Sequence, residues 1–156
     1  MTKVNANGIS IEVESYGALD APTVLLIMGL GAQLTLWPIE LVDALVARGF
    51  RVVRYDNRDI GLSTKFDSAG IPDMPSLMMA LMGGKAPDIA YTLTDMANDA
   101  VAVLDALGIA QAHIVGASMG GLTGLMAQAR DRVFSAMVLV DITPRWEASG
   151  VERILG

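Results

Sequence analysis

The feature that most constrains this chain is a serine set between two glycines, Gly116-Ala-Ser118-Met-Gly120. The apolar residues 112–115 before it predict a strand, and residues 119–130 after it predict a helix, so Ser118 stands at a strand-to-helix turn. Such a nucleophile elbow strains the serine backbone, and its glycines let strand and helix pass closely. The pattern predicts that Ser118 Oγ stands clear at the carboxyl end of the strand. The alternative is a tight turn without chemistry.

The rest of the chain alternates between strand-like and helix-like segments. Apolar runs bounded by turn residues predict strands at residues 3–6, 9–16, 23–27, 51–55, 112–115 and 136–140. Helices are predicted from Pro38, from Thr94 as N-cap, and over residues 119–130 and 147–155. Alternating strands and helices form parallel sheets with right-handed crossovers. We therefore expect an α/β fold: a mostly parallel sheet of about six strands with an N-terminal hairpin and flanking helices.

The hairpin is indicated by Asn7-Gly8, a dipeptide typical of a type I′ turn. In its second strand, residues 9–16, side chains alternate between apolar and polar. Because side chains point to opposite faces of a strand in turn, Glu12 and Glu14 are expected to face water.

Composition excludes several classes of protein. The net charge is −6 with no run of Lys or Arg, which argues against nucleic acids and anionic membrane surfaces as partners. The chain has no cysteine, so it has no disulfide framework and no thiolate metal site, and no motif calls for a metal or cofactor. At 156 residues it makes one domain, without a signal-peptide pattern or an apolar run long enough to span a bilayer. We expect a cytoplasmic protein.

Three loops should meet at the edge of the sheet where the parallel strands end: residues 28–33, residues 56–64 and the turn at Ser118. Acyl transfer needs a nucleophile and two backbone donors directed at the developing oxyanion. The Met119 amide directly follows the nucleophile and is one candidate. The Leu30 amide is the other, since Gly29 and Gly31 allow its loop to approach closely.

Three segments resemble one known family. They are Gly-Ala-Ser-Met-Gly-Gly (residues 116–121), Met-Gly-Leu-Gly (28–31) and Tyr-Asp-Asn-Arg-Asp-Ile-Gly-Leu-Ser (55–63). Together they resemble the α/β-hydrolase fold, and in particular its aclacinomycin methylesterase-like, carboxylesterase branch. The resemblance implies an esterase-type serine hydrolase for a small-molecule ester or other acyl substrate. It implies Ser118 as the nucleophile, and Leu30 and Met119 as oxyanion donors.

The sequence departs from the family pattern at two places. Met28 stands where many members have a histidine, as in the methylesterase-like branch, and Asp59 stands where a glycine is usual. The segment that contains Asp59 is expected equally as a structural support or as a substrate contact.

The family's triad is incomplete in this sequence. Its order is serine, acid, histidine, yet no histidine follows Ser118. The single histidine, His113, precedes Ser118 on the same strand at roughly 16 Å, so we interpret it as structural. Asp141 is a candidate acid or an ordinary turn residue. Without a base, Ser118 is a weak nucleophile, and we expect the isolated chain to be feeble or inactive.

The resemblance reaches only about the first half of the family's usual length. We therefore expect residues 1–156 to form the N-terminal part of an α/β-hydrolase domain, ending near the start of a cap. The strand at residues 136–140 would then be an apolar edge. A complementing C-terminal segment, or a second copy in a homo-oligomer, is the partner expected there.

Other interpretations stay open. Met78 and Met82 either line an adaptable substrate pocket together with the loop at Gly29 and Gly31, or fill core space in a short helix. The missing histidine also fits a non-catalytic binding protein of the same fold. A dinucleotide-binding module is a remote alternative, because the third glycine position of its fingerprint is occupied by Leu34.

Overall fold

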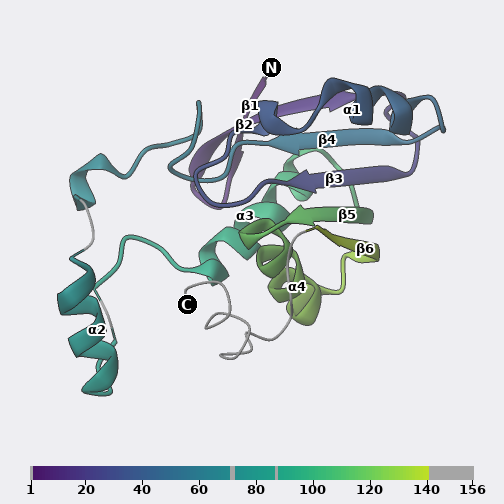
Figure 1. Ribbon diagram of the computed structural model, residues 1–156. Helices are drawn as coiled ribbons and strands as arrows, with labels where there is room; N and C mark the ends of the chain where they lie inside the picture. The colour runs from purple at the N-terminus through teal and green to yellow at the C-terminus, as the bar shows by residue number, and fades with distance from the viewer. Residues whose placement is uncertain (1, 71–72, 87, 141–156) are drawn as a thin grey trace, which may run out of the picture.

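The computed structural model describes residues 2–70, 73–86 and 88–140 (Figure 1). The strands are β1 (Thr2–Ala6), β2 (Ile9–Tyr16), β3 (Thr23–Ile27), β4 (Arg51–Tyr55), β5 (Ala112–Ala117) and β6 (Phe134–Val140). The helices are α1 (Ile39–Val46), α2 (Met74–Met82), α3 (Leu93–Ala106) and α4 (Met119–Asp131), with short 3-10 turns η1 (Leu34–Leu36) and η2 (Asp67–Ala69). The helix expected at residues 147–155 lies outside the described residues.

One sheet carries all six strands, in the order β1-β2-β4-β3-β5-β6. The hairpin β1-β2 is antiparallel and joins β4 in antiparallel fashion, whereas β4, β3, β5 and β6 run parallel. Asn7 and Gly8 both have positive φ, 50° and 77°, as the type I′ turn requires. The expected α/β fold with a mostly parallel sheet is confirmed.

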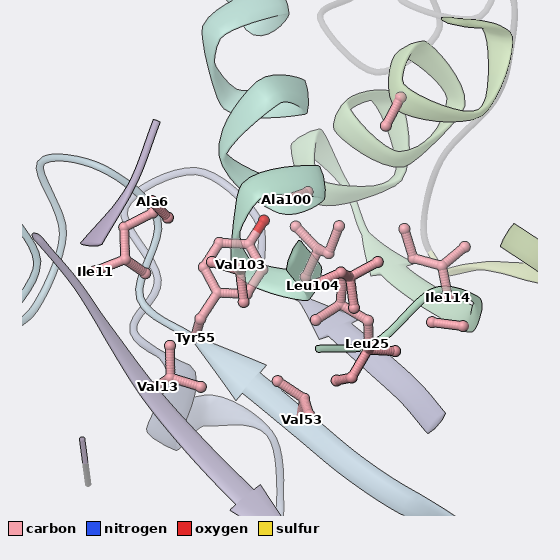
Figure 2. Close-up of a cluster of buried hydrophobic side chains, with 14 of the residues drawn as sticks. Ala6, Ile11, Val13, Leu25, Val53, Tyr55, Ala100, Val103, Leu104 and Ile114 are labelled. Atoms are coloured by element: carbon pink, nitrogen blue, oxygen red, sulfur yellow. The ribbon is translucent and has the colours of Figure 1, made fainter. Parts of the chain in front are cut away.

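Helices lie on both faces of the sheet. Leu25 and Val53 point toward α3 and α4, whereas their neighbours Val24 and Val52 point toward α1. Figure 2 shows the larger of these two cores, where side chains of β2, β3, β4 and β5 meet those of α3. Every residue of β3 and of β4 is buried, as in parallel strands covered on both faces.

Helix α2 differs from the other helices because it stands away from the sheet (Figure 1). Met78, Met79 and Met82 are exposed on it. No helix in the described ranges combines the length and the apolar character needed to cross a bilayer.

Two local expectations were wrong. The N-cap of α3 is Thr92 rather than Thr94: the Thr92 hydroxyl accepts a hydrogen bond from the Asp95 amide at 3.2 Å, and the Asp95 carboxylate accepts one from the Thr92 amide at 2.7 Å. This reciprocal pair is a capping box, and it places Thr94 inside the first turn. Strands β5 and β6 also extend two residues beyond the expected limits, to Ala117 and back to Phe134.

Glu12 and Glu14 are buried rather than exposed. The segment after β3 reaches this part of the sheet at Trp37. Glu14 accepts hydrogen bonds there from Arg54 Nε and from the Tyr16 hydroxyl, both at 2.7 Å. Arg54 in turn donates to the Trp37 carbonyl oxygen at 2.8 Å. In β2, the polar position at Glu14 is therefore part of a buried ion pair with Arg54 and does not face water.

The capping box predicts a contrast between two threonines at the same helix end, two positions apart in the sequence. Thr92→Ala removes the acceptor of the Asp95 amide and should lower the free energy of unfolding by about 1 kcal/mol. Thr94→Ala removes a hydroxyl with no capping role and should change it by less than about 0.5 kcal/mol. Urea unfolding followed by circular dichroism measures both, and equal losses would contradict the assignment of the cap.

Candidate active site

Ser118 lies between β5 and α4 in an unusual backbone conformation. Its φ is 49° and its ψ is −120°, a combination that L-residues adopt only under constraint, at a cost of about 1–3 kcal/mol. The bend is fixed from both sides: the Ser118 amide donates to the Val140 carbonyl oxygen, and the Ser118 carbonyl oxygen accepts from the Gly121 amide, both at 2.9 Å. The side chain is exposed at the carboxyl end of β5, as the motif predicts.

Close packing explains both glycines of the motif. A Cβ on Gly116 would lie 2.5 Å from Gly121 Cα, where α4 passes back over β5. A Cβ on Gly120 would overlap the carbonyl oxygens of Ile27 and Met28, at the end of β3. The missing side chains thus bring the first turn of α4 directly against the loop that follows β3.

That loop, residues 28–34, is called the oxyanion loop from here on. A Cβ placed on Gly29 would lie 3.1 Å from Ser118 Cβ and 3.7 Å from Ser118 Oγ, so the loop packs against the nucleophile candidate. Gly31 has a φ of 70°, and the Ala32 amide donates to the Gly29 carbonyl oxygen at 3.3 Å, which closes a turn.

Two amides beside Ser118 remain available to a ligand. Within the described ranges, neither the Leu30 amide nor the Met119 amide donates a hydrogen bond to a protein acceptor. Leu30 is 79% exposed, and Met119 begins α4, whose first amides have no partner within the helix, so both N–H groups are free to bind an acceptor from outside the protein. The arrangement can stabilise an oxyanion on an acyl carbon attached to Ser118.

The loop after β4 holds the oxyanion loop at both ends. Asp56 Oδ1 accepts a hydrogen bond from the Leu34 amide at 2.8 Å, and its Oδ2 accepts from the Leu62 amide at 2.9 Å. Asn57 Nδ2 donates to the Met28 carbonyl oxygen at 2.9 Å. All of these groups serve the protein itself, so the geometry favours the supporting role for this segment.

Arg58 anchors the same loop to α3. Its Nε donates to Asp99 Oδ2 at 2.6 Å and its Nη2 to Asp99 Oδ1 at 2.7 Å, a buried two-point pair. The guanidinium also lies 5.6 Å from the ring centre of Phe66 and 5.4 Å from that of Tyr91. Burial by itself would lower the pKa of Arg58, but its pairing with Asp99 raises it, so the guanidinium stays charged.

Asp59 stands where the family that this sequence resembles usually has glycine. The backbone conformation at this position explains why glycine is common there. Its φ is 68°, a left-handed conformation that favours glycine and that Asp tolerates better than most residues. The Asp59 carboxylate accepts from the Phe66 amide at 3.1 Å and from the Tyr91 hydroxyl at 3.3 Å. Burial, followed by the Asp59 charge, raises the pKa of Tyr91, so this hydroxyl remains a donor.

The remaining candidates lie away from Ser118 or outside the described residues. His113 is at the opposite end of β5 from Ser118, and its ring meets that of Phe50 edge to face with centroids 5.8 Å apart. It lines an apolar cavity of about 300 Å³ on the α1 side of the sheet. Asp141 lies outside the described residues. Met78 and Met82 are exposed on α2, and their role in binding stays a prediction.

Two supporting residues escaped the sequence analysis. Asp99 falls among the apolar positions of α3, and a carboxylate on a buried stripe signals a buried cation such as Arg58. Asn57 follows a fully buried strand, but no local pattern indicates that its amide reaches Met28.

Comparison with known proteins identifies the family and the fold. Residues 22–152 match the sequence profile of the family described as alpha/beta hydrolase fold. Rhodomycin D methylesterase DauP of Streptomyces sp. strain C5 is 37% identical over 123 residues, which is 78% of this chain and 35% of that protein. The chain thus spans about a third of the length of that relative.

Solved structures give the same picture. The enol-lactonase from Burkholderia xenovorans LB400 superposes with a TM-score of 0.67 at 30% identity, over 87% of this chain and 45% of the lactonase. Epoxide hydrolase VrEH1 from Vigna radiata superposes with a TM-score of 0.71 over 99% of this chain and 45% of its own, at 24% identity, and supports the fold alone.

The Glu14–Arg54 pair, beneath the segment that follows the oxyanion loop, makes stability depend on pH. Burial raises the pKa of Glu14, but hydrogen bonds from Tyr16 and Arg54, together with the Arg54 charge, outweigh it and leave the pKa below its usual value. A depressed carboxyl pKa stabilises the fold above the unfolded-state pKa of about 4.3, and this contribution is lost as the pH falls through the folded-state pKa.

Glu14→Gln should therefore be less stable than the wild type at neutral pH, by about 1–3 kcal/mol, and the gap should narrow between about pH 5 and about pH 3. Urea midpoints across that range measure the gap. Glu40→Gln, which changes an exposed carboxylate on α1, is the control. A gap that stayed constant with pH would refute the assignment.

Proposed function

Because the chain belongs to the α/β-hydrolase fold family, we propose that it carries the nucleophile and the oxyanion hole of a serine hydrolase that cleaves carboxylic esters. The observation that supports this most directly is the strained, exposed Ser118 with two unpaired amides beside it in the described part of the chain. Ser118 is the nucleophile, and the Leu30 and Met119 amides are the oxyanion donors.

The proposed reaction follows the usual course of acyl transfer. Ser118 Oγ forms a bond to the carbonyl carbon of the ester while its proton passes to a base. The carbonyl oxygen becomes an oxyanion and accepts hydrogen bonds from Leu30 and Met119. The oxyanion then collapses, the alcohol leaves with a proton, and water hydrolyses the acyl-enzyme by the same steps.

The base is the part of this proposal that the 156 residues do not supply. Their single histidine, His113, packs against Phe50 at the far end of β5. We propose that the base comes from a segment outside these residues, with Asp141 as a candidate for its acid partner. A positioned general base contributes about 10²–10⁴ in rate, so the chain alone should react feebly.

The substrate class is a small carboxylic ester or a lactone. DauP is named as a methylesterase, and the structural relative at 30% identity is an enol-lactonase. Both reactions pass through an oxyanion on an acyl carbon, which is the species that two backbone donors accommodate.

A partner at the sheet edge is a further part of the proposal. Among the described strands β6 forms one edge of the sheet and β1 the other, and Val138 and Val140 on β6 are 54% and 41% exposed. Apolar edges without charge are prone to pair, so we propose that a complementing C-terminal segment, or a second copy, covers it. Light scattering over a range of protein concentrations separates these two partners, since only pairing with a second copy doubles the mass. A well-behaved monomer that binds no apolar dye would overturn both alternatives.

A non-catalytic binding protein of the same fold is the second candidate. The observation that favours it is the sequence itself, which holds no histidine after Ser118. It differs from the hydrolase in one property that can be measured, because only an activated serine reacts readily with a phosphorus electrophile.

Fluorophosphonate labelling tests the proposal. The probe forms an Oγ–P bond and expels fluoride, and free imidazole supplies the missing base. We expect slow labelling of the wild type, at least about a tenfold increase with imidazole, and none in Ser118→Ala. Ser135→Ala, at an exposed serine on β6, should label like the wild type. Absence of label at Ser118 with imidazole present would favour the binding protein.

A further inference from the structure

We infer that Asn57 is a positioning residue for the oxyanion hole, because its side-chain amide fixes the peptide plane from which the Leu30 amide is oriented. This inference rests on the proposed function. The supporting contact is the hydrogen bond from Asn57 Nδ2 to the Met28 carbonyl oxygen at 2.9 Å. Asn57 is 2% exposed and Met28 is half-buried, so the donor side of the bond is shielded from competing water.

Sheet register places the two partners together. Strands β3 and β4 are parallel neighbours, and Ile27 pairs with Tyr55 as their last residues. The chain therefore leaves both strands at the same level, with Met28 beside Asp56 and with Asn57 one residue further. The contact joins residues 29 positions apart in the sequence, and it depends on the register.

The covalent geometry of the loop explains why the Met28 carbonyl matters. A peptide unit is planar, so holding the Met28 carbonyl oxygen holds the whole Met28–Gly29 unit. The next unit, Gly29–Leu30, contains the Leu30 N–H, and its carbonyl oxygen accepts from the Ala32 amide at 3.3 Å. In a trans peptide the N–H points opposite to the C=O, so this second bond directs the Leu30 amide away from the turn.

Only the two backbone torsions of Gly29 separate these fixed planes. Glycine has the widest torsional freedom of any residue, and a Cβ on Gly29 would lie 3.1 Å from Ser118 Cβ and 3.2 Å from the Ala117 carbonyl oxygen, which a larger residue would have to displace. Without the Asn57 bond, that freedom would let the Leu30 amide swing away from Ser118. The hydrogen bond from Asn57 thus limits the backbone freedom that a glycine at position 29 introduces.

Asp56 holds the far end of the oxyanion loop but is a poor probe. Its carboxylate also accepts from the Leu62 amide and packs on Gly61, so its removal would disturb the whole loop after β4. The Asn57 side chain makes a single hydrogen bond to a protein partner within the described residues. Its substitution therefore isolates the contact with Met28.

The test compares Asn57→Leu, which keeps much of the volume and loses the donor, with Asn98→Leu. Asn98 accepts a hydrogen bond from Arg130 far from the site, so this variant controls for loss of an asparagine contact. Asn57→Ser, which is smaller and polar, is the second variant if the leucine is not tolerated. Amide hydrogen exchange of residues 28–34 and the imidazole-assisted labelling rate of Ser118 are measured for each.

In Asn57→Leu we expect the exchange rate of amides in residues 28–34 to rise at least about tenfold. We expect the labelling rate of Ser118 to fall by about 10–100-fold, a loss no larger than that caused by removing an oxyanion donor. The exchange rates of amides in β3 and α3 of Asn57→Leu should equal those in the wild type and in Asn98→Leu. A general loss of stability would raise these rates as well. Unchanged exchange in residues 28–34, an unchanged labelling rate, or faster exchange throughout the sheet would overturn the inference.

Failure of the inference can be told from failure of the proposed function. If wild-type Ser118 does not label even with imidazole, the proposed function fails, and exchange alone then decides whether Asn57 holds the loop. If the wild type labels and Asn57→Leu labels equally fast, the proposed function stands and the positioning role fails.

Discussion

The close approach of α4 to the end of β3 is the constraint on which the rest of the site depends. Gly120 lies against the carbonyl oxygens of Ile27 and Met28 with no room for a side chain. This contact joins two loops that are far apart in the sequence, and it brings Ser118 and Gly29 together. A larger residue at position 120 would force the helix outward and would carry the Met119 amide away from the oxyanion loop.

Support for the site is distributed over buried polar groups, which are costly unless every member is paired. The pair Arg54–Glu14 lies beneath the segment after the oxyanion loop, and the pair Arg58–Asp99 ties the loop after β4 to α3. The first pair lies across the paired strands β2 and β4, where Arg54 also donates to the Trp37 carbonyl oxygen, and the second pair joins a loop to a helix. The site therefore has a polar framework under an aliphatic sheet, and the framework specifies loop positions rather than adding to the core.

Much of the fold and the central motif could be predicted because their signals are local. Asn7-Gly8 specifies its turn through positive φ at two adjacent residues, and the spacing of Gly116, Ser118 and Gly120 reflects one bend. The polar contacts could not be predicted, because Glu14 and Arg54 are 40 positions apart and Arg58 and Asp99 are 41. Periodicity indicates which face a residue occupies within its own element but not which element lies opposite, and so Glu14 was expected in water.

The same distinction between local backbone features and distant side-chain contacts applies to the proposed catalytic site. The elbow and the proposed oxyanion donors are backbone features, made by the turn at Ser118 and by the loop that follows β3. A general base is a side chain that has to be brought to Ser118 from another element. The strained serine conformation is maintained here by packing within the sheet, at a cost in stability that the fold bears without the base. The geometry of Ser118 is therefore set within the described residues, and the proposed reaction accordingly expects that a small diffusible base can assist this serine.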